Sequence, residues 1–436
     1  MASIQKRKNS YCVHVSNGRD INGRQITETA TFKPDPNKTD YQNKKALQKF
    51  AIDFEEKVKS GKYLNGEKIT FQEFSEQWLK DYVIRHMEDK TYALYEDYLQ
   101  RHINPEIGHL KLSKVQPVHL NKLYNKLATE RKDGRVGGYS AKTIKDIHDI
   151  ISSLFHTAVE WNIVTDNPCS RVRPPKPERQ NSDIKYFTLS EAQRFLNFLD
   201  KGYQVEIKAH DRVDDTGKKY HVDSYSESKK IPTQFKLFFH IALFCGMRRG
   251  EIVALEWSDI DFEKSEISIT KSTVSVKGRS VTKKPKTKAS IRKVSVPAHI
   301  VSTAKIYRKE QLQYRMSIGS QWIGDNYIFI QWDGKQMHPD TPYKTFKKII
   351  AKYNETVGEK EKLPDIALHG LRHTNATLLI SQNVDVNTVA GALGHSRAST
   401  TTDIYGHSLK KAKEEAAKKM ESLFYQEQNP DGESTK

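Results

Sequence analysis

The spacing of apolar side chains divides the chain into three regions, and the first of these changes from a strand period to a helix period. Residues 10–15 alternate apolar and polar side chains, and residues 25–32 form a second β-prone run rich in threonine. The dipeptides Asn17-Gly18 and Asn22-Gly23 between them are typical of turns, and residues 41–60 carry apolar side chains at helical spacing. Residues 1–63 hold 13 Lys/Arg against 7 Asp/Glu. This predicts a small β-sheet-plus-helix module, either a β-ribbon that reads DNA or a solvated accessory domain.

The second region, residues 68–170, is helical throughout by the same criterion. Pro105, Gly108 and a glycine-rich loop at 133–138 separate its helices. Three apolar stripes comprise Phe71, Phe74, Trp78, Leu79 and Tyr82, then Val118, Leu123, Tyr124 and Leu127, then Ile144, Ile147, Ile151, Leu154, Phe155 and Ala158. These stripes predict an all-α domain of four helices, with the aromatic side chains in its core.

A basic segment rich in proline, residues 171–182, follows the helical region. It begins Arg-Val-Arg-Pro-Pro-Lys-Pro and cannot continue a helix, because proline lacks the amide donor and clashes with the preceding turn. Such a linker between two basic domains is able to run along a duplex. A plain spacer is the competing interpretation.

The third region, residues 183–425, is the largest domain. Thr188 begins a helix, since Thr-Leu-Ser-Glu is a capping box. The domain mixes helices with β segments, which are expected at 265–276, 290–296 and 326–330. Residues 202–230 are a long polar connection to which the sequence assigns no role, and residues 426–436 are a polar, flexible tail. We therefore expect a multidomain α+β protein.

Composition adds charge to this picture and excludes other classes of protein. The 436 residues contain 72 Lys/Arg against 54 Asp/Glu, a formal net charge of +18. Such a surplus favours a polyanionic partner, with nucleic acid the leading candidate and a merely basic surface the alternative. A mean hydropathy of −0.73 and the lack of any apolar run near 18 residues argue against a transmembrane helix. Three widely separated cysteines, Cys12, Cys169 and Cys245, fit a reducing cytosol, so a cytoplasmic location is expected.

Four separated segments of the largest domain carry residues that packing alone does not require. The first, Cys245-Gly-Met-Arg-Arg-Gly-Glu251, follows an apolar helix over 235–244, which Gly246 ends. An arginine pair in so tight a turn is held rigidly. Glu251 is able to begin the next helix, and we expect it to pair with Arg248 and orient it.

The second segment, residues 271–293, contains nine Lys/Arg and no acidic residue. Two β-prone arms flank a turn rich in lysine, proline and threonine, which predicts a hairpin with a cationic tip. Such a hairpin can enter a groove and place one lysine against a phosphate. A solvated basic loop is the alternative.

The third and fourth segments supply histidines, an arginine and a tyrosine. In His-Gly-Leu-Arg-His, His369 and Arg372 stand at i and i+3, so they share a helix face near its positive N-terminus, where an anion is favoured. His395 and Tyr405 enclose a polar stretch rich in serine and threonine. Little apolar sequence surrounds Tyr405, so a reactive role competes with a place in the core.

Together these residue types meet the needs of phosphoryl transfer to a tyrosine. Two arginines can fork onto the non-bridging oxygens of a phosphodiester and stabilise a pentavalent transition state. A tyrosine hydroxyl can attack the phosphorus and form a covalent intermediate. A lysine can protonate the departing 5′-oxygen, while histidines move the nucleophile's proton or hold an oxygen. No dense carboxylate cluster suggests two-metal catalysis, although scattered Asp/Glu triads stay open as an alternative, and no cofactor is expected.

In this order and spacing, the four segments resemble those of the tyrosine recombinases, specifically the lambda-type integrases of phages and conjugative transposons from Gram-positive bacteria. GMRRGE resembles the first arginine box, PKTKASIRKVSVP the β-hairpin lysine segment, HGLRH the His-x-x-Arg box, and LGHSRASTTTDIY the His…Tyr box. The resemblance implies a role for each of seven residues: Arg248 and Arg372 clamp the scissile phosphate, Lys286 is the general acid, His369 assists proton transfer, His395 binds a phosphate oxygen, Tyr405 is the nucleophile, and Glu251 supports the arginine.

The resemblance covers the whole chain. It implies an arm-binding β module (1–63), a SAM-like helical core-binding domain (68–170) and a mixed α/β catalytic domain (183–425). The implied enzyme integrates or excises a mobile element through a 3′-phosphotyrosine, without metal or ATP. Its expected partners are double-stranded DNA at core and arm attachment sites, three further copies in a homotetramer, a directionality factor and a host DNA-bending protein, with no membrane. The residues expected to contact DNA are Lys6, Arg7, Arg24, Arg171, Arg173, Lys283, Lys284 and Lys288.

Two other functions compete with recombination. A type IB topoisomerase uses a similar site to relax supercoils, although relaxation needs neither an arm-binding module nor a basic linker. A non-catalytic DNA-binding regulator with a decayed recombinase domain is the second, although all six expected catalytic residues are present. A helix expected at 408–424, directly after Tyr405, could pack on a neighbouring protomer or on its own domain.

Overall fold

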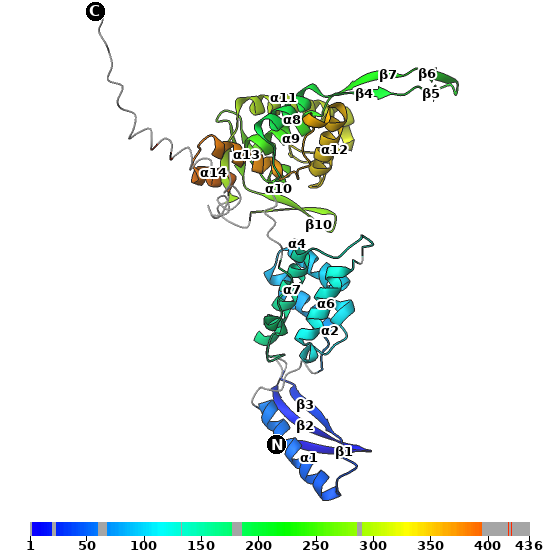
Figure 1. The fold of residues 1–436 in the computed structure, drawn as a ribbon, viewed down its shortest axis with the longest axis vertical. Helices are drawn as coiled ribbons and strands as arrows, with labels where there is room; N and C mark the ends of the chain where they lie inside the picture. Colours follow the sequence, from blue (N-terminus) through cyan, green and yellow to red (C-terminus); the bar gives the residue numbers. More distant parts are fainter. Residues whose placement is uncertain are drawn as a thin grey trace, which may run out of the picture. The chain divides into compact units, whose positions relative to one another are not determined.

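The protein is described by a computed structural model over residues 2–19, 23–59, 68–131, 133–176, 185–285 and 290–394, together with Ala417 and Met420. Its contacts form two compact units, Met1–Arg179 and Gln180–Lys436 (Figure 1). No helix within the described ranges is both long and apolar enough to cross a membrane.

The first unit begins with a three-stranded antiparallel sheet in the order β1-β2-β3, covered by one helix. The elements are β1 (Ser3–Arg7), β2 (Ser10–Arg19), β3 (Gln25–Phe32) and α1 (Asp40–Lys59). Val13 and Val15 pack against Leu47, Phe54 and Val58 of α1 in a core of their own. The predicted strands and helix are therefore present, and β1 is an addition. All five β1 side chains are exposed, so the strand has no alternation that a hydrophobic pattern could reveal.

Of the two predicted turns, that at Asn22-Gly23 begins with a residue outside the described ranges, and that at Asn17-Gly18 is wrong. Both residues lie inside β2, where the pairing with β3 shifts register between Ser16 and Arg19. Gly18 adopts a φ of +82° there, so the glycine serves an irregularity in the strand instead of ending it.

The rest of the first unit is helical. Its elements are α2 (Phe71–Trp78), the π-helical η2 (Leu79–Val83), α3 (Ile84–His86), α4 (Asp89–Tyr98), the π-helical η3 (Leu99–Ile103), α5 (Asn104–Ile107), η4 (Leu112–Lys114), α6 (Pro117–Thr129), α7 (Ala141–Glu160) and η5 (Pro168–Arg171). Because α2–η2–α3 and α4–η3–α5 are continuous, the four predicted helices are present. All six predicted core residues of α7 are buried, whereas Val118 is 49% exposed and Leu120 is buried in its stripe instead.

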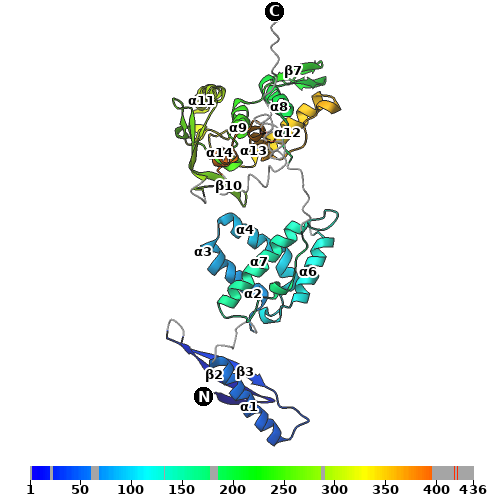
Figure 2. The same ribbon diagram turned by 60° about the vertical axis from the view of Figure 1, so that its left-hand side comes forward.

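An apolar helix, α9, lies at the centre of the second unit. The helices of this unit are α8 (Leu189–Lys201), α9 (Thr233–Phe244), α10 (Arg249–Val253), η6 (Trp257–Asp259), α11 (Ala298–Ile318), η8 (Gly319–Gln321), α12 (Thr341–Thr356), η9 (Glu359–Glu361), α13 (Gly370–Ser381) and α14 (Val386–Leu393). The predicted capping box at Thr188 begins α8. Residues 237–243 of α9 are all buried, and α8, α10, α11, α12 and α13 contact this helix. Figure 2 shows α8, α11, α12 and α13 around α9. The hydrophobic core of the second unit includes Phe195, Phe238, Phe239 and Phe346.

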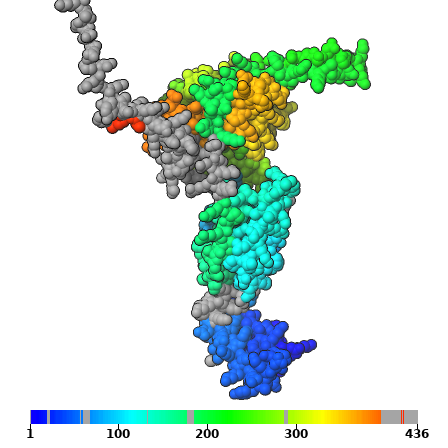
Figure 3. Space-filling view, in the orientation of Figure 1, coloured from blue at the N-terminus to red at the C-terminus, as the bar shows by residue number. Residues whose placement is uncertain are grey.

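Small antiparallel sheets lie around these helices. The strands are β4 (Tyr203–Ile207), β5 (His210–Val213), β6 (Lys219–Val222), β7 (Tyr225–Lys229), β8 (Ile260–Asp261), β9 (Glu266–Ile269), β10 (Ser272–Val276), β11 (Arg279–Lys283) and β12 (Arg292–Ser295). β4 pairs with β7 and β5 with β6, so the polar connection predicted at 202–230 is a two-stranded ribbon that projects from its unit (Figures 1 and 3). The strand expected at 326–330 is absent from this described segment, which makes only isolated bridges at Tyr327 and Ile330.

The predicted hairpin is correct in kind and wrong in position. Its strands are β10 and β11, and its turn is Lys277-Gly278, whose φ values of +47° and +78° form the two-residue turn that suits a hairpin's twist. The lysine-rich segment therefore follows the hairpin instead of forming its tip. It leads to β12, which pairs with β9 in a different sheet.

Candidate active site

The turn between α9 and α10 is built around a glycine that no other residue could replace without strain. Gly246 has a φ of +58°, and a Cβ there would lie 2.5 Å from Cδ2 of Leu393 and 2.8 Å from Oδ1 of Asn375. As expected, this glycine ends the apolar helix. The close approach brings the residues that follow it, including Arg248, against the end of α14.

Arg248 and Glu251 form the expected ion pair at the start of α10. The Arg248 backbone N–H donates to Glu251 Oε2 at 2.9 Å, and Nη1 donates to Oε1 at 2.9 Å. Arg292 of β12 donates to the same carboxylate, with 3.0 Å between Nη2 and Oε2. Burial raises the pKa of Glu251, but the hydrogen bond and charge of Arg292, with those of Arg248, outweigh it and lower that pKa below its ordinary value. Glu251 is therefore ionised at neutral pH.

The two arginines of the turn point to different acids. Arg249 Nη1 donates to Oδ1 of Asp340 at 2.9 Å, away from Glu251. Arg248 is thus the arginine of the turn that pairs with Glu251, as expected.

Arg372 and Arg248 meet at the same short segment of backbone. Arg372 is 2% exposed; its Nη1 donates to the carbonyl oxygen of Gly246 at 2.7 Å and its Nη2 to that of Leu393 at 2.8 Å. Arg248 Nη2 donates to the carbonyl oxygen of Gly394, the next residue, at 3.1 Å. Two guanidinium groups from helices 124 residues apart in sequence are therefore held beside one helix end.

His369 lies at the N-terminus of α13, one turn before Arg372, as predicted. Its exposed ring is 4.8 Å from that of His373, centroid to centroid, and it lines a cavity of about 290 Å³ together with Arg249 and Tyr343. Burial, with the charges of His369 and Arg372, lowers the pKa of His373 to about 4. His373 is therefore neutral at pH 7.

Three of the six catalytic candidates lie outside the described residues, so the structure does not place them: Lys286, His395 and Tyr405. The same holds for Lys288 and for nearly all of the helix expected at 408–424. Lys283 ends β11 and Lys284 follows it, exposed. Gly394, with a φ of +68°, caps α14 and immediately precedes His395.

The remaining DNA-binding candidates belong to the first unit. Lys6 and Arg7 are exposed on β1, and Arg24 is exposed just before β3. Arg173 is exposed in the basic linker, whereas Arg171 forms an ion pair with Asp166.

The sequence pattern did not indicate a role for Arg292 at this site. Arg292 counted only as one charge of a basic run, yet its side chain is 8% exposed and bonded to Glu251. A strand period contained the signal, because Arg292, Val294 and Val296 share one face, and both valines are buried.

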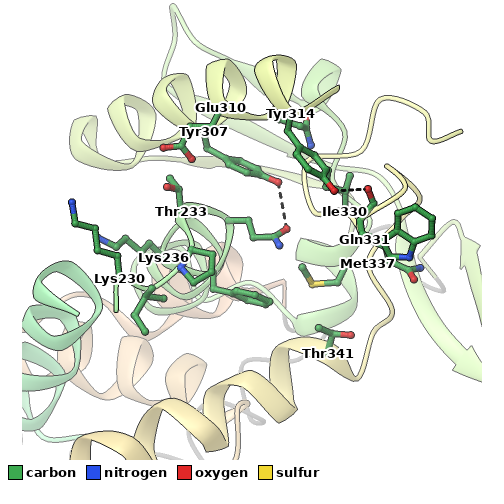
Figure 4. A pocket seen from close by; sticks show the side chains of 16 residues that line it. Lys230, Thr233, Lys236, Tyr307, Glu310, Tyr314, Ile330, Gln331, Met337 and Thr341 are labelled. Atoms are coloured by element: carbon green, nitrogen blue, oxygen red, sulfur yellow. Dashed lines mark hydrogen bonds between the residues drawn. The ribbon is translucent and has the colours of Figure 1, made fainter. Parts of the chain in front are cut away.

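A larger cavity of about 660 Å³ lies elsewhere in the second unit, between the start of α9 and α11 (Figure 4). In it, the Tyr307 hydroxyl donates to Oε1 of Gln234 at 3.3 Å, and that of Tyr314 to the carbonyl oxygen of Trp332 at 2.9 Å. Its lining includes neither Arg248, Glu251, His369 nor Arg372. Within the described part of the chain, no group of three or more His, Cys, Asp or Glu residues is arranged to hold a metal ion.

Comparison with known proteins identifies the family. The family described as "Phage integrase family" matches residues 220–412, and "Phage integrase, N-terminal SAM-like domain" matches residues 70–128. A tyrosine recombinase XerC-like protein of Caldanaerobacter subterraneus is 27% identical over 438 aligned positions, covering 97% of this chain and 98% of its own. The ICEBs1 integrase of Bacillus subtilis is 28% identical over 287 positions, covering 66% and 67%.

Solved structures share the fold. The Tn1549 transposon integrase in complex with a circular intermediate DNA matches with a TM-score of 0.58 at 17% identity, over 80% of this chain and 99% of that one. A lambda integrase dimer bound to a core site matches with a TM-score of 0.51 at 15% identity, over 92% and 94%. The family match over residues 220–412 and the XerC-like relative define an enzyme that cuts and rejoins DNA strands. The chain belongs to the phage integrase family and is a tyrosine recombinase, which confirms the resemblance and the predicted site-specific recombination.

Proposed function

We propose that this recombinase assembles its cleavage site around Arg248 and Arg372, which clamp the scissile phosphate. The observation that carries the proposal is their shared anchor, because they bind the carbonyls of two consecutive residues, Leu393 and Gly394. His395 is the next residue of the chain. Fixed positive charge beside that position stabilises the charge that develops on a phosphate under attack.

The proposed reaction is a balanced exchange of phosphate esters. The Tyr405 hydroxyl attacks the phosphorus, the bond from phosphorus to the 5′-oxygen breaks, and Lys286 protonates the departing oxygen. His369 takes part in moving the tyrosine proton, and His395 binds a phosphate oxygen. The 3′-phosphotyrosine retains the ester's energy, so a 5′-hydroxyl of another strand can displace the tyrosine without ATP or a metal ion.

The proposed DNA partners and assembly follow from the modules. Residues 68–170 and 183–425, joined by the basic linker 171–182, bind the core site, and residues 1–63 bind an arm site through exposed cations such as Lys6 and Arg7. The Tn1549 and lambda integrases are described in complex with DNA, which supports DNA as the partner. Each crossover exchanges four strands, so we propose a homotetramer in the bacterial cytoplasm, assisted by a directionality factor and a host DNA-bending protein.

Trapping the covalent intermediate tests the proposal. A suicide DNA substrate has a nick close to the scissile phosphate, so the short fragment that carries the new 5′-hydroxyl diffuses away and cannot be rejoined. With the natural chain, this substrate should accumulate a covalent protein–DNA adduct. Tyr405→Phe should bind DNA as before but form no adduct, since it removes only the attacking oxygen. Tyr314→Phe is the matched control, because its hydroxyl lies in the separate 660 Å³ cavity, and it should form the adduct normally. An adduct with Tyr405→Phe would assign the nucleophile elsewhere, with Tyr343 and Tyr353 the next tyrosines to test.

A further inference from the structure

Arg292 occupies the centre of the network that holds the arginine site together. Its Nη2 donates to Glu251 Oε2 at 3.0 Å, and its Nη1 lies 3.3 Å from Oε1 of the same carboxylate. Its Nε donates to the carbonyl oxygen of Ala392 at 2.8 Å. One side chain of β12 therefore joins the start of α10 to the end of α14.

Arg292 and Arg248 both bind Glu251, but they differ in burial and therefore in role. The side chain of Arg292 is 8% exposed and that of Glu251 is 4% exposed, whereas that of Arg248 is 38% exposed. Glu251 neutralises the charge of Arg292, and each guanidinium nitrogen of Arg292 donates within the protein. Arg292 can influence the reaction only through the groups that it touches.

The guanidinium of Arg292 also packs against Gly394. A Cβ on that glycine would lie 2.8 Å from Nη1 and 3.1 Å from Cζ of Arg292, so the two groups are in direct contact. Ala392 and Gly394 enclose Leu393, and the carbonyls of Leu393 and Gly394 are those that Arg372 and Arg248 bind. Arg292 thus fixes the segment on which both arginines rest.

We propose that Arg292 is a positioning residue, which aims Arg248 through Glu251 and holds the 392–394 segment in place for both arginines. The inference rests on the proposed role of Arg248 and Arg372 at the scissile phosphate. Arg292 is a buried residue of β12, the strand that follows the lysine segment. Its place in a basic run did not suggest this role.

The test compares two DNA substrates, one with a normal scissile phosphate and one with a methylphosphonate, which lacks the negative charge that the arginines neutralise. Arg292→Met should slow single-turnover cleavage of the normal substrate by about 100-fold, the scale of losing one preorganised donor. DNA affinity in a gel shift should change by less than about threefold. The defect should shrink on the methylphosphonate, and Arg292→Lys, which keeps the charge, should recover part of the rate. Lys293→Met is the matched control, being the next residue on β12, 64% exposed and paired with Glu266, and should cleave normally.

Three results would overturn the inference: an equal defect on both substrates, normal cleavage by Arg292→Met, or the same defect in Lys293→Met. A double-mutant cycle adds an independent readout, because in an Arg248→Ala background the Arg292→Met change should cost little more. Full additivity would show that Arg292 does not act through Arg248. If Arg292→Met fails to fold, Arg292→Lys on the two substrates decides the question. Failure of the natural chain to form any adduct would refute the proposed function instead.

Discussion

Glu251→Gln should destabilise the second unit strongly, although it changes one atom and no volume. The carboxylate accepts four N–H donors at 2.9 to 3.3 Å, two on each oxygen, from Arg248 and Arg292. A glutamine keeps one acceptor oxygen, so two of these bonds are lost in either orientation. Bonds to charged groups contribute about 1.5–3 kcal/mol each. Because Arg248 is partly exposed and can turn to water, we expect a loss of about 3–5 kcal/mol, the range for breaking a buried pair.

The effect should depend on pH with a definite sign. The folded-state pKa of Glu251 is lowered, so its stabilisation is complete above the unfolded pKa of about 4.3 and disappears as pH falls through the lower folded value. Urea titration of the full chain, followed by hydrogen exchange of peptides from α9 and α10, measures the difference. It should be constant from pH 7 to about pH 5 and shrink below about pH 4.

The exposed Glu263 provides a matched control, because Glu263→Gln should shift stability by less than about 0.5 kcal/mol. The reasoning would be refuted if Glu251→Gln cost less than about 1 kcal/mol at pH 7. It would also be refuted if the difference were as large at low pH as at neutral pH.

Two further predictions concern the lysine segment and the first module. Lys286→Ala should slow cleavage far more than Lys284→Ala, and a 5′-bridging phosphorothiolate should rescue it, because sulfur leaves without protonation; rescue of Lys288→Ala instead would reassign the general acid. Deleting residues 1–63 should abolish recombination between full attachment sites but spare cleavage of a minimal core site, since the sheet and α1 have their own core. Footprinting of the isolated 1–63 fragment at increasing salt should show arm-site protection that weakens steeply, and no binding at low salt would contradict this.

Local patterns were sufficient wherever a residue's environment depends on its neighbours in sequence. The apolar stripe of α7 predicted its buried face, and the Thr188 capping box predicted where α8 begins. The positions of Gly246, Arg248 and Glu251 in one tight turn also followed from sequence, because a helix end, a turn and a new helix within seven residues leave little conformational freedom. The ion pair of Arg248 with Glu251 is of the same local kind.

Tertiary structure decided which distant residues share the site and which charges are buried. Lys277-Gly278 forms the hairpin turn because both residues adopt positive φ, while β12 pairs with β9 across the sheet, and this pairing carries Arg292 to Glu251. In the sequence Arg292 is one of nine basic residues in a run without acids, and its alternation with Val294 and Val296 indicates a strand face but not the carboxylate that pairs with it. Arg292 becomes buried when β12, α10 and α14 pack together. Only then do the Glu251 carboxylate and the Ala392 carbonyl compensate for the removal of the Arg292 charge from water.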